Sequence, residues 1–422
     1  MSRTPKAALF FILATVALDA IGIGLIFPVT PELMISVTGG SVGEAALWGG
    51  VITASFAVMQ FLFGPIVGNL SDHYGRRPVL LISLAVVGAN YVVMALTASV
   101  WVLLMARMVT GIASATHSTA NAYIADISDP DTRAKRFGLV GAAFGLGFIA
   151  GPALGGLVGA IDPRAPFWMA AGLAAANLAL GALVMPESLA ASLRRPFSLA
   201  RANPLASLAA IRRLPGLKVL LVVSFIYSLT FNVWPSVWAY FGTETYGWNA
   251  SWIGLSLALF GVCMALVQGL LVGPVIRVLG ERRTVMAGFS VETLSYSFLA
   301  FNGSGLLALI STPFSALGGI TGPALSALSS RATPQNQQGE LQGVMTSINA
   351  LAMILAPLVM TWVFGLFSGP AAPVYFPGAP FLLSAALMVA AVIVFVATPR
   401  EISPAGAESA SEPGPAPAKD SP

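Results

Sequence analysis

Apolar runs recur along the whole chain, and they constrain its fold more than any other feature. A run of about twenty residues spans the hydrocarbon core of a bilayer as a helix, because a helix rises about 1.5 Å per residue. Short polar links separate these runs. We predict twelve helices at about 7–27, 46–69, 78–98, 101–124, 137–158, 166–185, 217–241, 251–276, 284–302, 305–328, 343–367 and 378–397. The sequence therefore predicts an all-α membrane protein with twelve transmembrane helices.

The composition agrees with a chain that crosses the membrane many times. Hydrophobic residues make up 56% of the 422 residues and charged residues only 9%, against roughly 25% charged residues in soluble proteins. The single cysteine, Cys263, excludes an internal disulfide, and two histidines without a Cys/His cluster give no recognisable zinc site. No nucleotide-binding glycine loop or nucleophile constellation is present, which disfavours an ATP-driven protein or an enzyme. Thinly spread basic residues disfavour nucleic acid as a partner.

The charge distribution predicts how the chain sits in the membrane. With the N-terminus inside, 19 of the 21 Lys and Arg residues fall in cytoplasmic segments, as the positive-inside rule requires. The tryptophans lie near the opposite helix ends, where an aromatic belt belongs. The first apolar run continues past Asp19 without a cleavage pattern, so we expect a retained helix. We predict a multi-pass protein of a bacterial inner membrane with both termini in the cytoplasm.

The two halves of the chain carry one pattern at an offset of 205 residues, because Gly68 and Gly75 recur as Gly273 and Gly280. Six helices per copy in one orientation is the parallel-repeat plan of secondary transporters, which handle substrate between the halves near the midplane. We predict an N-terminal bundle at 1–185, a cytoplasmic linker at 186–216, a C-terminal bundle at 217–398 and a disordered cytoplasmic tail at 399–422.

A charged, glycine-containing loop, GNLSDHYGRRPVLL, begins at Gly68 and links the second and third predicted helices. Its glycines, the second at Gly75, permit a tight turn and close helix approach. Asp72 beside Arg76 and Arg77 can form charge-assisted hydrogen bonds that break and reform as the halves move. A basic loop that only sets topology is the plainer interpretation. The second copy keeps the glycines without the acid, which favours a gate in one half.

A second glycine pattern lies in the fifth predicted helix. Gly141 and Gly145 are one turn apart, and Gly151 with Pro152 interrupts the hydrogen-bond ladder. Close helix packing explains these small residues without a further function. A gating hinge would need the same residues. Both interpretations stay open at this point.

Polar residues inside the predicted helices need an explanation, because a charge at mid-depth costs at least about 2.5 kcal/mol. Asp19 lies in the middle of the first helix, and Arg107 lies in the fourth. An embedded arginine needs a partner, and Asp19 is the nearest acid of the right kind. A structural ion pair is the alternative to a functional one. His117 is expected in the helix interior, with a proton relay as its further role.

Several motifs together resemble one transporter family. The charged loop resembles the signature loop of the major facilitator superfamily, RMVTGIASA from Arg107 its helix-4 motif, and GAAFGLGFIAGPALGG from Gly141 the helix-5 motif of its antiporters. LDAIGIGLIFPVTP, YIADISDPDTRAKRFG, YGWNASWIGLSLALFG and QQGELQG are similar to stretches of the tetracycline/proton antiporter family. The resemblance implies the major facilitator fold, with two six-helix bundles that provide alternating access.

The resemblance also implies roles for single residues. Asp19 matches the family's helix-1 acid and Glu292 in GFSVETLSYSF its helix-9 acid, which implies proton coupling, with His117 as a third candidate. Gln60 and Gln268 match its substrate-facing glutamines.

Of the three remaining positions expected in the substrate cavity, one matches the family pattern and two differ from it. Arg107 matches the family's helix-4 arginine, whereas Asn90 stands where the family has an Asp and Met264 where it has a histidine. Neither Asn90 nor Met264 exchanges protons, so coupling is expected to rest on the acids and His117.

The sequence thus predicts a secondary active exporter that exchanges a tetracycline-like or other amphipathic drug for protons. We expect protons, the lipid bilayer and a small drug-like molecule as partners, and a functional monomer. No cofactor is expected, and a divalent cation enters only within a chelated substrate. An endogenous metabolite or a sugar-like solute is the alternative cargo, and a receptor or scaffold is the alternative class. A static binder would need neither the signature loop nor a midplane acid.

Overall fold

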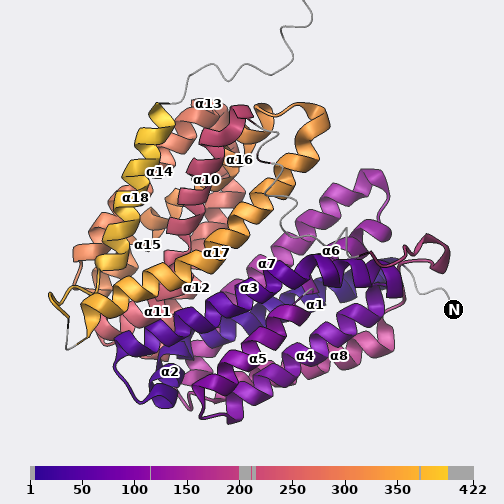
Figure 1. Ribbon diagram of the computed structural model, residues 1–422, viewed down its shortest axis with the longest axis horizontal. Coiled ribbons are helices and arrows are strands. Elements are labelled where there is room, and N and C mark those ends of the chain that lie inside the picture. Colours follow the sequence, from indigo (N-terminus) through magenta and orange to yellow (C-terminus); the bar gives the residue numbers. More distant parts are fainter. Residues whose placement is uncertain (1–4, 115, 199–210, 212–214, 370–371, 398–422) are drawn as a thin grey trace, which may run out of the picture.

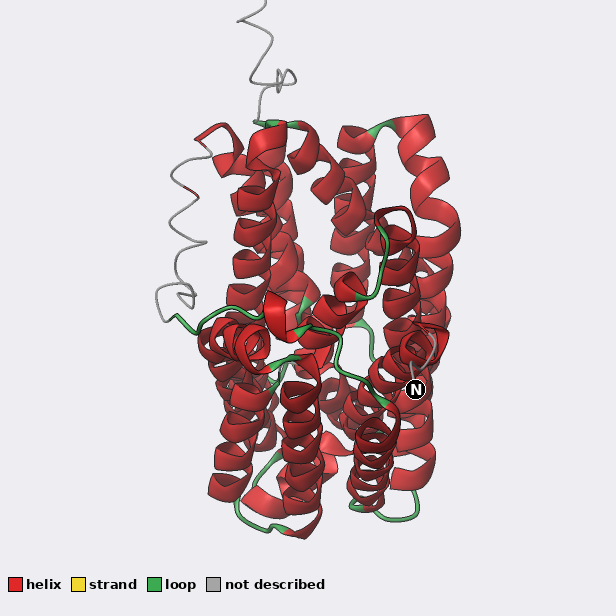
Figure 2. Cartoon of the chain, turned by 90° about the vertical axis from the view of Figure 1, so that its right-hand side faces the viewer, coloured by secondary structure: helices red, strands yellow, loops and turns green. Residues whose placement is uncertain are grey.

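The computed structural model describes residues 5–114, 116–198, 211, 215–369 and 372–397. In this part of the chain, helices follow one another through short loops and no strand is present (Figure 2). The predicted tail at 399–422 and positions 199–210 and 212–214 of the predicted linker lie outside the described residues. The all-helical fold predicted from the apolar runs is confirmed.

The first half of the chain contains six consecutive spans. The first span continues through a 3-10 turn into a second short helix, and the fourth consists of two helices. The elements are α1 (Pro5–Ile26), η1 (Phe27–Val29), α2 (Thr30–Thr38), α3 (Val42–Tyr74), α4 (Arg76–Leu96), α5 (Val100–Ala113), α6 (Thr116–Asp126), α7 (Pro130–Gly159) and α8 (Ala165–Val184).

The second half repeats this order with more interruptions. Its elements are η5 (Pro215–Leu217), α10 (Lys218–Phe231), α11 (Val233–Tyr246), α12 (Ala250–Leu266), the π-helical turn η6 (Val267–Leu271), α13 (Val272–Leu279), α14 (Glu281–Phe301), α15 (Gly305–Leu317), η7 (Gly318–Ile320), α16 (Thr321–Arg331), η8 (Gln335–Gln337), α17 (Gln338–Ser368) and α18 (Ala379–Val396). One further 3-10 turn, η2 (Ala191–Leu193), lies between the halves.

Ten spans among the described residues are long and apolar enough to cross a membrane by length and composition. The other two spans do not meet this criterion. The fourth span is divided at Ser114 into α5 and α6, and α14 carries Glu281, Arg282, Arg283 and Glu292. With these two included, the described helices follow the order of the twelve predicted spans.

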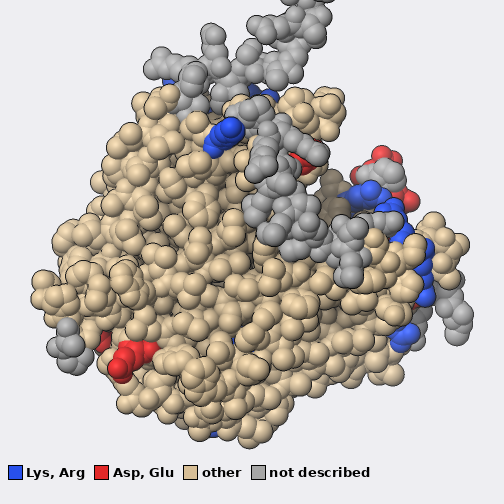
Figure 3. All heavy atoms as spheres, viewed as in Figure 1, with Lys and Arg blue, Asp and Glu red and all other residues tan. Residues whose placement is uncertain are grey.

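The two halves form two bundles that meet along α3, α7, α12 and α17 (Figure 1). We call the end of the molecule where α8 ends and α10 begins the linker end, and the opposite end the far end. On the face shown in Figure 3, most visible Lys and Arg side chains lie at the top and right together with some Asp and Glu, and a wide uncharged surface separates them from further acids at lower left. An uncharged belt between polar ends fits a protein embedded in lipid.

Two glycine turns at the linker end show that the sequence repeat is also a backbone repeat. Gly75 joins α3 to α4 with φ 106° and ψ 162°, and Gly280 joins α13 to α14 with φ 75° and ψ 161°. This backbone region is essentially restricted to glycine. The recurrence of these glycines 205 residues apart therefore has a conformational cause.

The fourth and tenth spans break at equivalent positions. Ser114 ends α5 with non-helical angles, φ −76° and ψ 62°. Gly319, 205 residues later, lies in the 3-10 turn between α15 and α16. The second and eighth spans differ, because α3 is α-helical throughout whereas its counterpart contains the π-helical turn η6. The halves are thus similar copies with local differences in the helices that line their interface.

Candidate transport site

At the far end, the interface helices α3 and α17 pack backbone against backbone. A Cβ atom added at Gly50 would collide with Thr361 and would lie 2.8 Å from the carbonyl oxygen of Pro357. A Cβ atom added at Gly43 would lie 3.3 Å from the Cα of Gly365. Because the contact at Gly50 leaves no room for a methyl group and the one at Gly43 is also close, the two bundles are closed against each other here.

The second helix pair, α7 and α12, closes the other side of the far end. A Cβ atom at Gly156 would lie 3.0 Å from the Cα of Gly254. The Ser251 hydroxyl donates a hydrogen bond of 3.2 Å to the carbonyl oxygen of Gly156. Both helix pairs therefore seal the interface at the far end.

The same four helices stand apart at the linker end. Added Cβ atoms on their glycines would meet no described atom within 4 Å. These glycines are Gly64 and Gly68 on α3, Gly138, Gly141 and Gly145 on α7, Gly269 in η6, Gly273 on α13 and Gly339 on α17. The linker-end elements α6, α13 and α16 pack mainly within their own halves. The space between the bundles therefore opens toward the linker end.

The glycines of the helix-5 motif divide between these two regions. A Cβ atom at Gly151 would lie 2.7 Å from the Cα of Gly24 on α1, and the carbonyl oxygen of Pro152 lies against Gly254. Gly141 and Gly145 have open surroundings. In this conformation, close helix packing therefore explains Gly151 and Pro152. Gly141 and Gly145 have no such neighbours, so they can contact another helix when the bundles move.

The signature loop forms a charge network at the linker end. Arg76 donates to Asp72 at 2.5 Å and to Asp126, at the end of α6, at 3.1 Å. Arg77 points elsewhere, because its guanidinium donates to the carbonyl oxygen of Ala182 at 2.6 Å. The predicted contact of the acid with both arginines thus holds for Arg76, and Asp126 is a partner that the loop sequence did not reveal.

Glu187, which follows α8, is a second residue of this network that sequence reasoning missed. Its carboxylate accepts hydrogen bonds from the backbone N–H groups of Arg76 at 2.9 Å and Arg77 at 3.2 Å. An anion at a helix N-terminus satisfies unpaired N–H groups and interacts well with the helix dipole. More than a hundred residues of sequence separate Glu187 from α4, so no local pattern could have indicated this cap.

Asp19 lies in a small pocket within the first bundle. The polar lining of the pocket consists of Asp19, Tyr91 and Asn177. Asn177 accepts a buried hydrogen bond of 3.0 Å from Thr15. Asp19 is partly exposed, and no described residue donates a hydrogen bond to it. The pocket thus holds a carboxylate in the membrane interior beside a tyrosine.

The expected ion pair between Asp19 and Arg107 is wrong for this conformation. Among the described residues, neither forms an ion pair. The Arg107 guanidinium instead lies 5.9 Å from the ring centre of Phe56. The ring gives the cation a favourable contact, so Arg107 has an alternative to the carboxylate that the sequence did not suggest.

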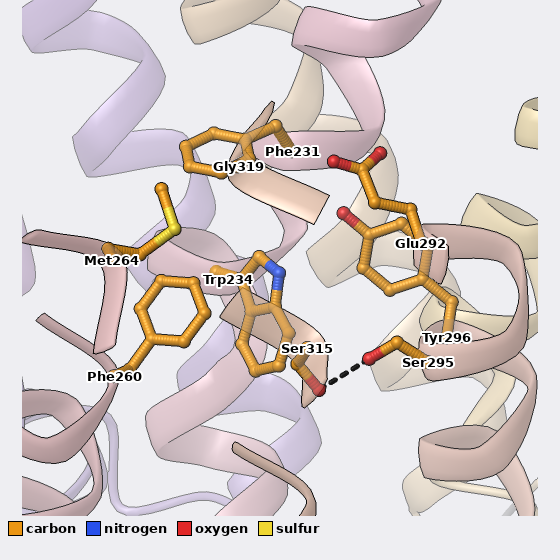
Figure 4. Close-up of a pocket in the computed structure, with 9 residues that line it drawn as sticks. All are labelled: Phe231, Trp234, Phe260, Met264, Glu292, Ser295, Tyr296, Ser315 and Gly319. Atoms are coloured by element: carbon orange, nitrogen blue, oxygen red, sulfur yellow. Dashed lines mark hydrogen bonds between the residues drawn. The ribbon is translucent and has the colours of Figure 1, made fainter. Parts of the chain in front are cut away.

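Glu292 lies in a corresponding pocket of the second bundle (Figure 4). The lining residues of the pocket come from α10, α11, α12, α14, α15 and η7 and are Phe231, Trp234, Phe260, Met264, Glu292, Ser295, Tyr296, Ser315 and Gly319. The structure thus brings the predicted residues Glu292 and Met264 together. Tyr296 and Tyr91 are 205 residues apart, so each acid lies near the same tyrosine of the repeat.

The predicted substrate-facing amides lie in three different surroundings. The Gln60 amide donates to the hydroxyl of Ser114 at 3.1 Å, at the break between α5 and α6. Gln268 is exposed within the π-helical turn η6. Asn90 is buried, and its amide donates to the sulfur of Met94 at 3.5 Å. Gln268 therefore lies within an irregular helix turn and Gln60 contacts one, and such turns often occur at functional sites.

The side chain of His117 lies outside the described positions, although its backbone belongs to α6. Among the described residues, no group of three or more His, Cys, Asp or Glu side chains could hold a metal ion.

Comparison with known proteins identifies this architecture. The sequence model of the Major Facilitator Superfamily matches residues 12–249 and 220–420. The chain therefore belongs to this superfamily of membrane transporters and, within it, to the family of the tetracycline resistance proteins. The class C tetracycline resistance protein of Escherichia coli is 43% identical over 85% of this chain and 89% of its own length. The class G protein of Vibrio anguillarum is 37% identical over 86% of this chain and 92% of its own length.

Solved structures show the same fold. The crystal structure of the nucleoside transporter NupG superposes with a TM-score of 0.77 at 13% sequence identity, covering 93% of this chain and 98% of that one. The structure of a D-xylose-proton symporter gives a TM-score of 0.71 at 17% identity. The predicted fold class and the resemblance to tetracycline/proton antiporters are both confirmed.

Proposed function

We propose that the protein exports tetracycline-like amphipathic drugs from the cytoplasm in exchange for protons. Two kinds of observation support this function. Relatives named tetracycline resistance proteins are 37 to 43% identical to the chain over most of its length. Within the fold, one carboxylate in each bundle lies beside a pocket and lacks a cationic partner among the described residues. The second observation carries the proposal, because an unpaired acid inside a membrane protein is costly unless its protonation is used.

The proposed coupling uses Asp19 and Glu292 as proton carriers, with His117 as the third candidate. A protonated acid is neutral and a deprotonated one is charged, so the two forms stabilise different conformations of a transporter. Alternating access exposes such a group first to one side of the membrane and then to the other. The inward movement of protons would thus drive the outward movement of the drug. Asp72 and Arg76 would control the linker end during this cycle.

The drug would bind between the bundles at mid-depth. Gln60, Asn90, Gln268 and Arg107 supply hydrogen-bond donors for the polar edge of a tetracycline, and Met264 supplies a deformable apolar contact. We assign no cofactor to the protein, and a divalent cation would enter only as part of a chelated drug. Protons and the drug-like molecule are the proposed partners, and one chain contains both bundles, so we propose that the monomer is functional.

The proposed orientation follows from charge. We infer that the linker end faces the cytoplasm of a bacterium and that the protein resides in the inner membrane with both termini inside, because most basic residues belong to linker-end segments. The conformation open toward the linker end would then be the state that admits the drug from the cytoplasm.

The test uses the purified full chain in liposomes that contain a pH-sensitive dye. When tetracycline is added with a pH gradient across the membrane, we expect drug movement against its concentration gradient and a matching movement of protons. A protonophore should abolish both. Tetracycline movement without proton movement, or neither process in correctly inserted protein, would contradict the proposal.

A further inference from the structure

We propose that the pocket around Asp19 binds one water molecule and that Asn177 positions this water to donate a hydrogen bond to the charged Asp19 carboxylate. The inference rests on the proposed function and deepens it, because it adds a positioning residue to a proposed proton carrier. We call Thr15, Asp19, Tyr91 and Asn177 the Asp19 cluster. Its geometry, its polar groups without partners and the size of its pocket each indicate a water site.

The Asp19 cluster joins three helices of the first bundle, in which α8 packs against both α1 and α4 (Figure 1). On α1, Thr15 precedes Asp19 by four residues and Gly22 follows it by three, so the three positions share one face of the helix. Asn177 of α8 contacts this face at Thr15. Tyr91 of α4 contacts it at Gly22, where an added Cβ atom would lie 3.0 Å from the tyrosine hydroxyl oxygen. Along the helix, Asp19 therefore lies between an amide and a phenol.

Thr15 fixes the orientation of the Asn177 amide. The Thr15 hydroxyl is fully buried and donates a hydrogen bond of 3.0 Å to Oδ1 of Asn177. The oxygen and the NH₂ group are the two arms of one planar amide, so this bond leaves the NH₂ group for the pocket that Asn177 lines. No described residue accepts a hydrogen bond from the NH₂ group. The cluster thus presents an amide donor to the pocket that holds the carboxylate.

The Tyr91 hydroxyl and the Asp19 carboxylate also lack hydrogen-bond partners among the described residues. Tyr91 is 5% exposed and Asn177 is 1% exposed, and polar groups buried to this degree are normally hydrogen-bonded to protein or to ordered water. The three groups line one space with room for about one water molecule, and a buried water typically makes about three hydrogen bonds. The water would accept hydrogen bonds from Asn177 and Tyr91 and donate one to Asp19.

This arrangement favours the charged form of Asp19. A water whose oxygen accepts two hydrogen bonds keeps its O–H groups for donation, and a hydrogen bond to a carboxylate stabilises the charged form over the neutral acid. A protonated Asp19 would instead compete with Asn177 and Tyr91 for the water oxygen. In the conformation open toward the linker end, the Asp19 cluster would therefore promote release of the proton from Asp19.

Other ionisable groups lie away from the Asp19 pocket. Among the described residues, Tyr91 is the only further ionisable side chain that lines it. The elements packed against α1 are α6, α7, α8 and η1, of which α8 and η1 contain no ionisable residue. The charged residues of α7 lie in its first two turns at the linker end. On α6, Asp126 and Tyr123 form bonds elsewhere, and the side chain of His117 lies outside the described positions. The neutral donors of the cluster are therefore the groups to vary.

Infrared spectroscopy of the purified full chain in detergent tests the proposal. The C=O band of protonated Asp19 is identified as the band that disappears in Asp19→Asn, and its intensity is followed against pH. The test variants are Asn177→Leu and the nearly isosteric Thr15→Val and Tyr91→Phe. Thr312→Val is the matched control, because Thr312 is a buried threonine of the second half whose hydroxyl bonds to its own helix backbone. Exchange into ¹⁸O-labelled water identifies the O–H bands of the bound water.

We expect the midpoint of the Asp19 titration to move upward by at least about one pH unit in Asn177→Leu, which is a tenfold gain in proton affinity. Thr15→Val and Tyr91→Phe should move the midpoint in the same direction, whereas Thr312→Val should leave it unchanged. A water band sensitive to ¹⁸O should be present in the parent and absent in Asn177→Leu. An unchanged midpoint in Asn177→Leu, or a water band that persists in it, overturns the inference. If Asn177→Leu does not fold, the same criteria apply to Thr15→Val.

The liposome assay with tetracycline separates this inference from the proposed function, because the infrared measurement needs neither drug nor transport. A water site that depends on Asn177, without tetracycline-driven proton movement in liposomes, would contradict only the proposed function. Intact tetracycline exchange with an unchanged Asp19 midpoint in Asn177→Leu would contradict only the water site.

Discussion

Asp19 and Glu292 are acids of the same chemical kind in unlike surroundings. Asp19 is partly exposed beside Tyr91 and Asn177, whereas Glu292 is buried among aromatic rings near Tyr296. Electrostatic effects of a carboxylate depend strongly on its local dielectric. The two acids should therefore differ in what each contributes, with Asp19 better placed to exchange protons with water and Glu292 better shielded.

Replacing Asp19 with Asn tests its part in proton coupling. The amide keeps size and hydrogen-bonding capacity but cannot release a proton, so tetracycline-driven proton movement and uphill export should fall to background in liposomes. Downhill drug exchange should persist, because it requires only the conformational cycle.

The control for this variant is Asp162→Asn, since Asp162 lies in an exposed loop where it accepts a hydrogen bond from the backbone of Arg164. Uphill export at the parent rate in Asp19→Asn would make Asp19 a structural residue and leave Glu292 as the leading carrier.

For single residues, the sequence predicts which polar side chains lie inside the membrane but not which of them contact one another. Length and hydropathy suffice to place Asp19 and Arg107 at mid-depth, since a helix has a fixed rise. The neighbours of both residues come from other helices, because Tyr91 of α4 lines the pocket of Asp19 and Phe56 of α3 lies against Arg107. Contacts between distant segments are set by packing, which no local pattern records.

Among the elements, the breaks in the fourth and tenth spans show a similar limit. The apolar runs predict one helix from 101 to 124, whereas the structure divides it at Ser114, where Gln60 of α3 donates a hydrogen bond. Short polar residues can leave a helix when another partner satisfies the backbone or hydroxyl group. The break thus involves a contact with α3, which the sequence does not show. The sequence does show that Ser114 and Gly319 are related by the 205-residue repeat.

The equivalent turns at Gly75 and Gly280 should differ in how well they tolerate alanine. Ala at Gly75 or at Gly280 must adopt a glycine-restricted conformation, which costs about 1–3 kcal/mol in either case. A Cβ atom at Gly75 would also lie 2.7 Å from the Glu187 carboxyl carbon, whereas one at Gly280 would meet nothing within 4 Å.

Gly75→Ala should therefore lower the thermal unfolding temperature of the purified protein more than Gly280→Ala does. Equal effects of the two substitutions would mean that the Glu187 cap adds no constraint to the turn.

The charge network of the signature loop makes a second prediction for the elements. Asp72→Asn weakens the ion pair with Arg76, so uphill export should fall at least about tenfold, since charge-assisted hydrogen bonds are roughly twice as strong as neutral ones. Expression and insertion should be unchanged. The control variant is Asp131→Asn, which removes the charge of an exposed acid near the start of α7. The gate role would fail if both variants exported drug at the parent rate.

For the whole molecule, the closed far end and the open linker end define one state of the transport cycle. The contact of Gly43 on α3 with Gly365 on α17 allows this state to be trapped. Cysteines whose Cβ atoms lie about 3.5–4.5 Å apart can form a disulfide. In a Cys263→Ser background, the pair Gly43→Cys and Gly365→Cys should cross-link on oxidation.

The cross-linked protein should lose uphill export, because the far end can no longer open, and a reducing agent should restore it. Export is measured in vesicles before and after reduction, and each single cysteine variant serves as a control. Undiminished export by fully cross-linked protein would show that the far end does not open during transport.

The closure at the far end also has a consequence for how resistance can change under selection. Gly50, Gly156 and Gly254 contact backbone or side-chain atoms of the opposite bundle so closely that a single added methyl group cannot fit. The glycines that face the opening toward the linker end have no such neighbours. A population challenged with successive drugs should therefore accumulate substitutions around the pockets and the linker-end opening, while these far-end glycines stay fixed in every surviving lineage.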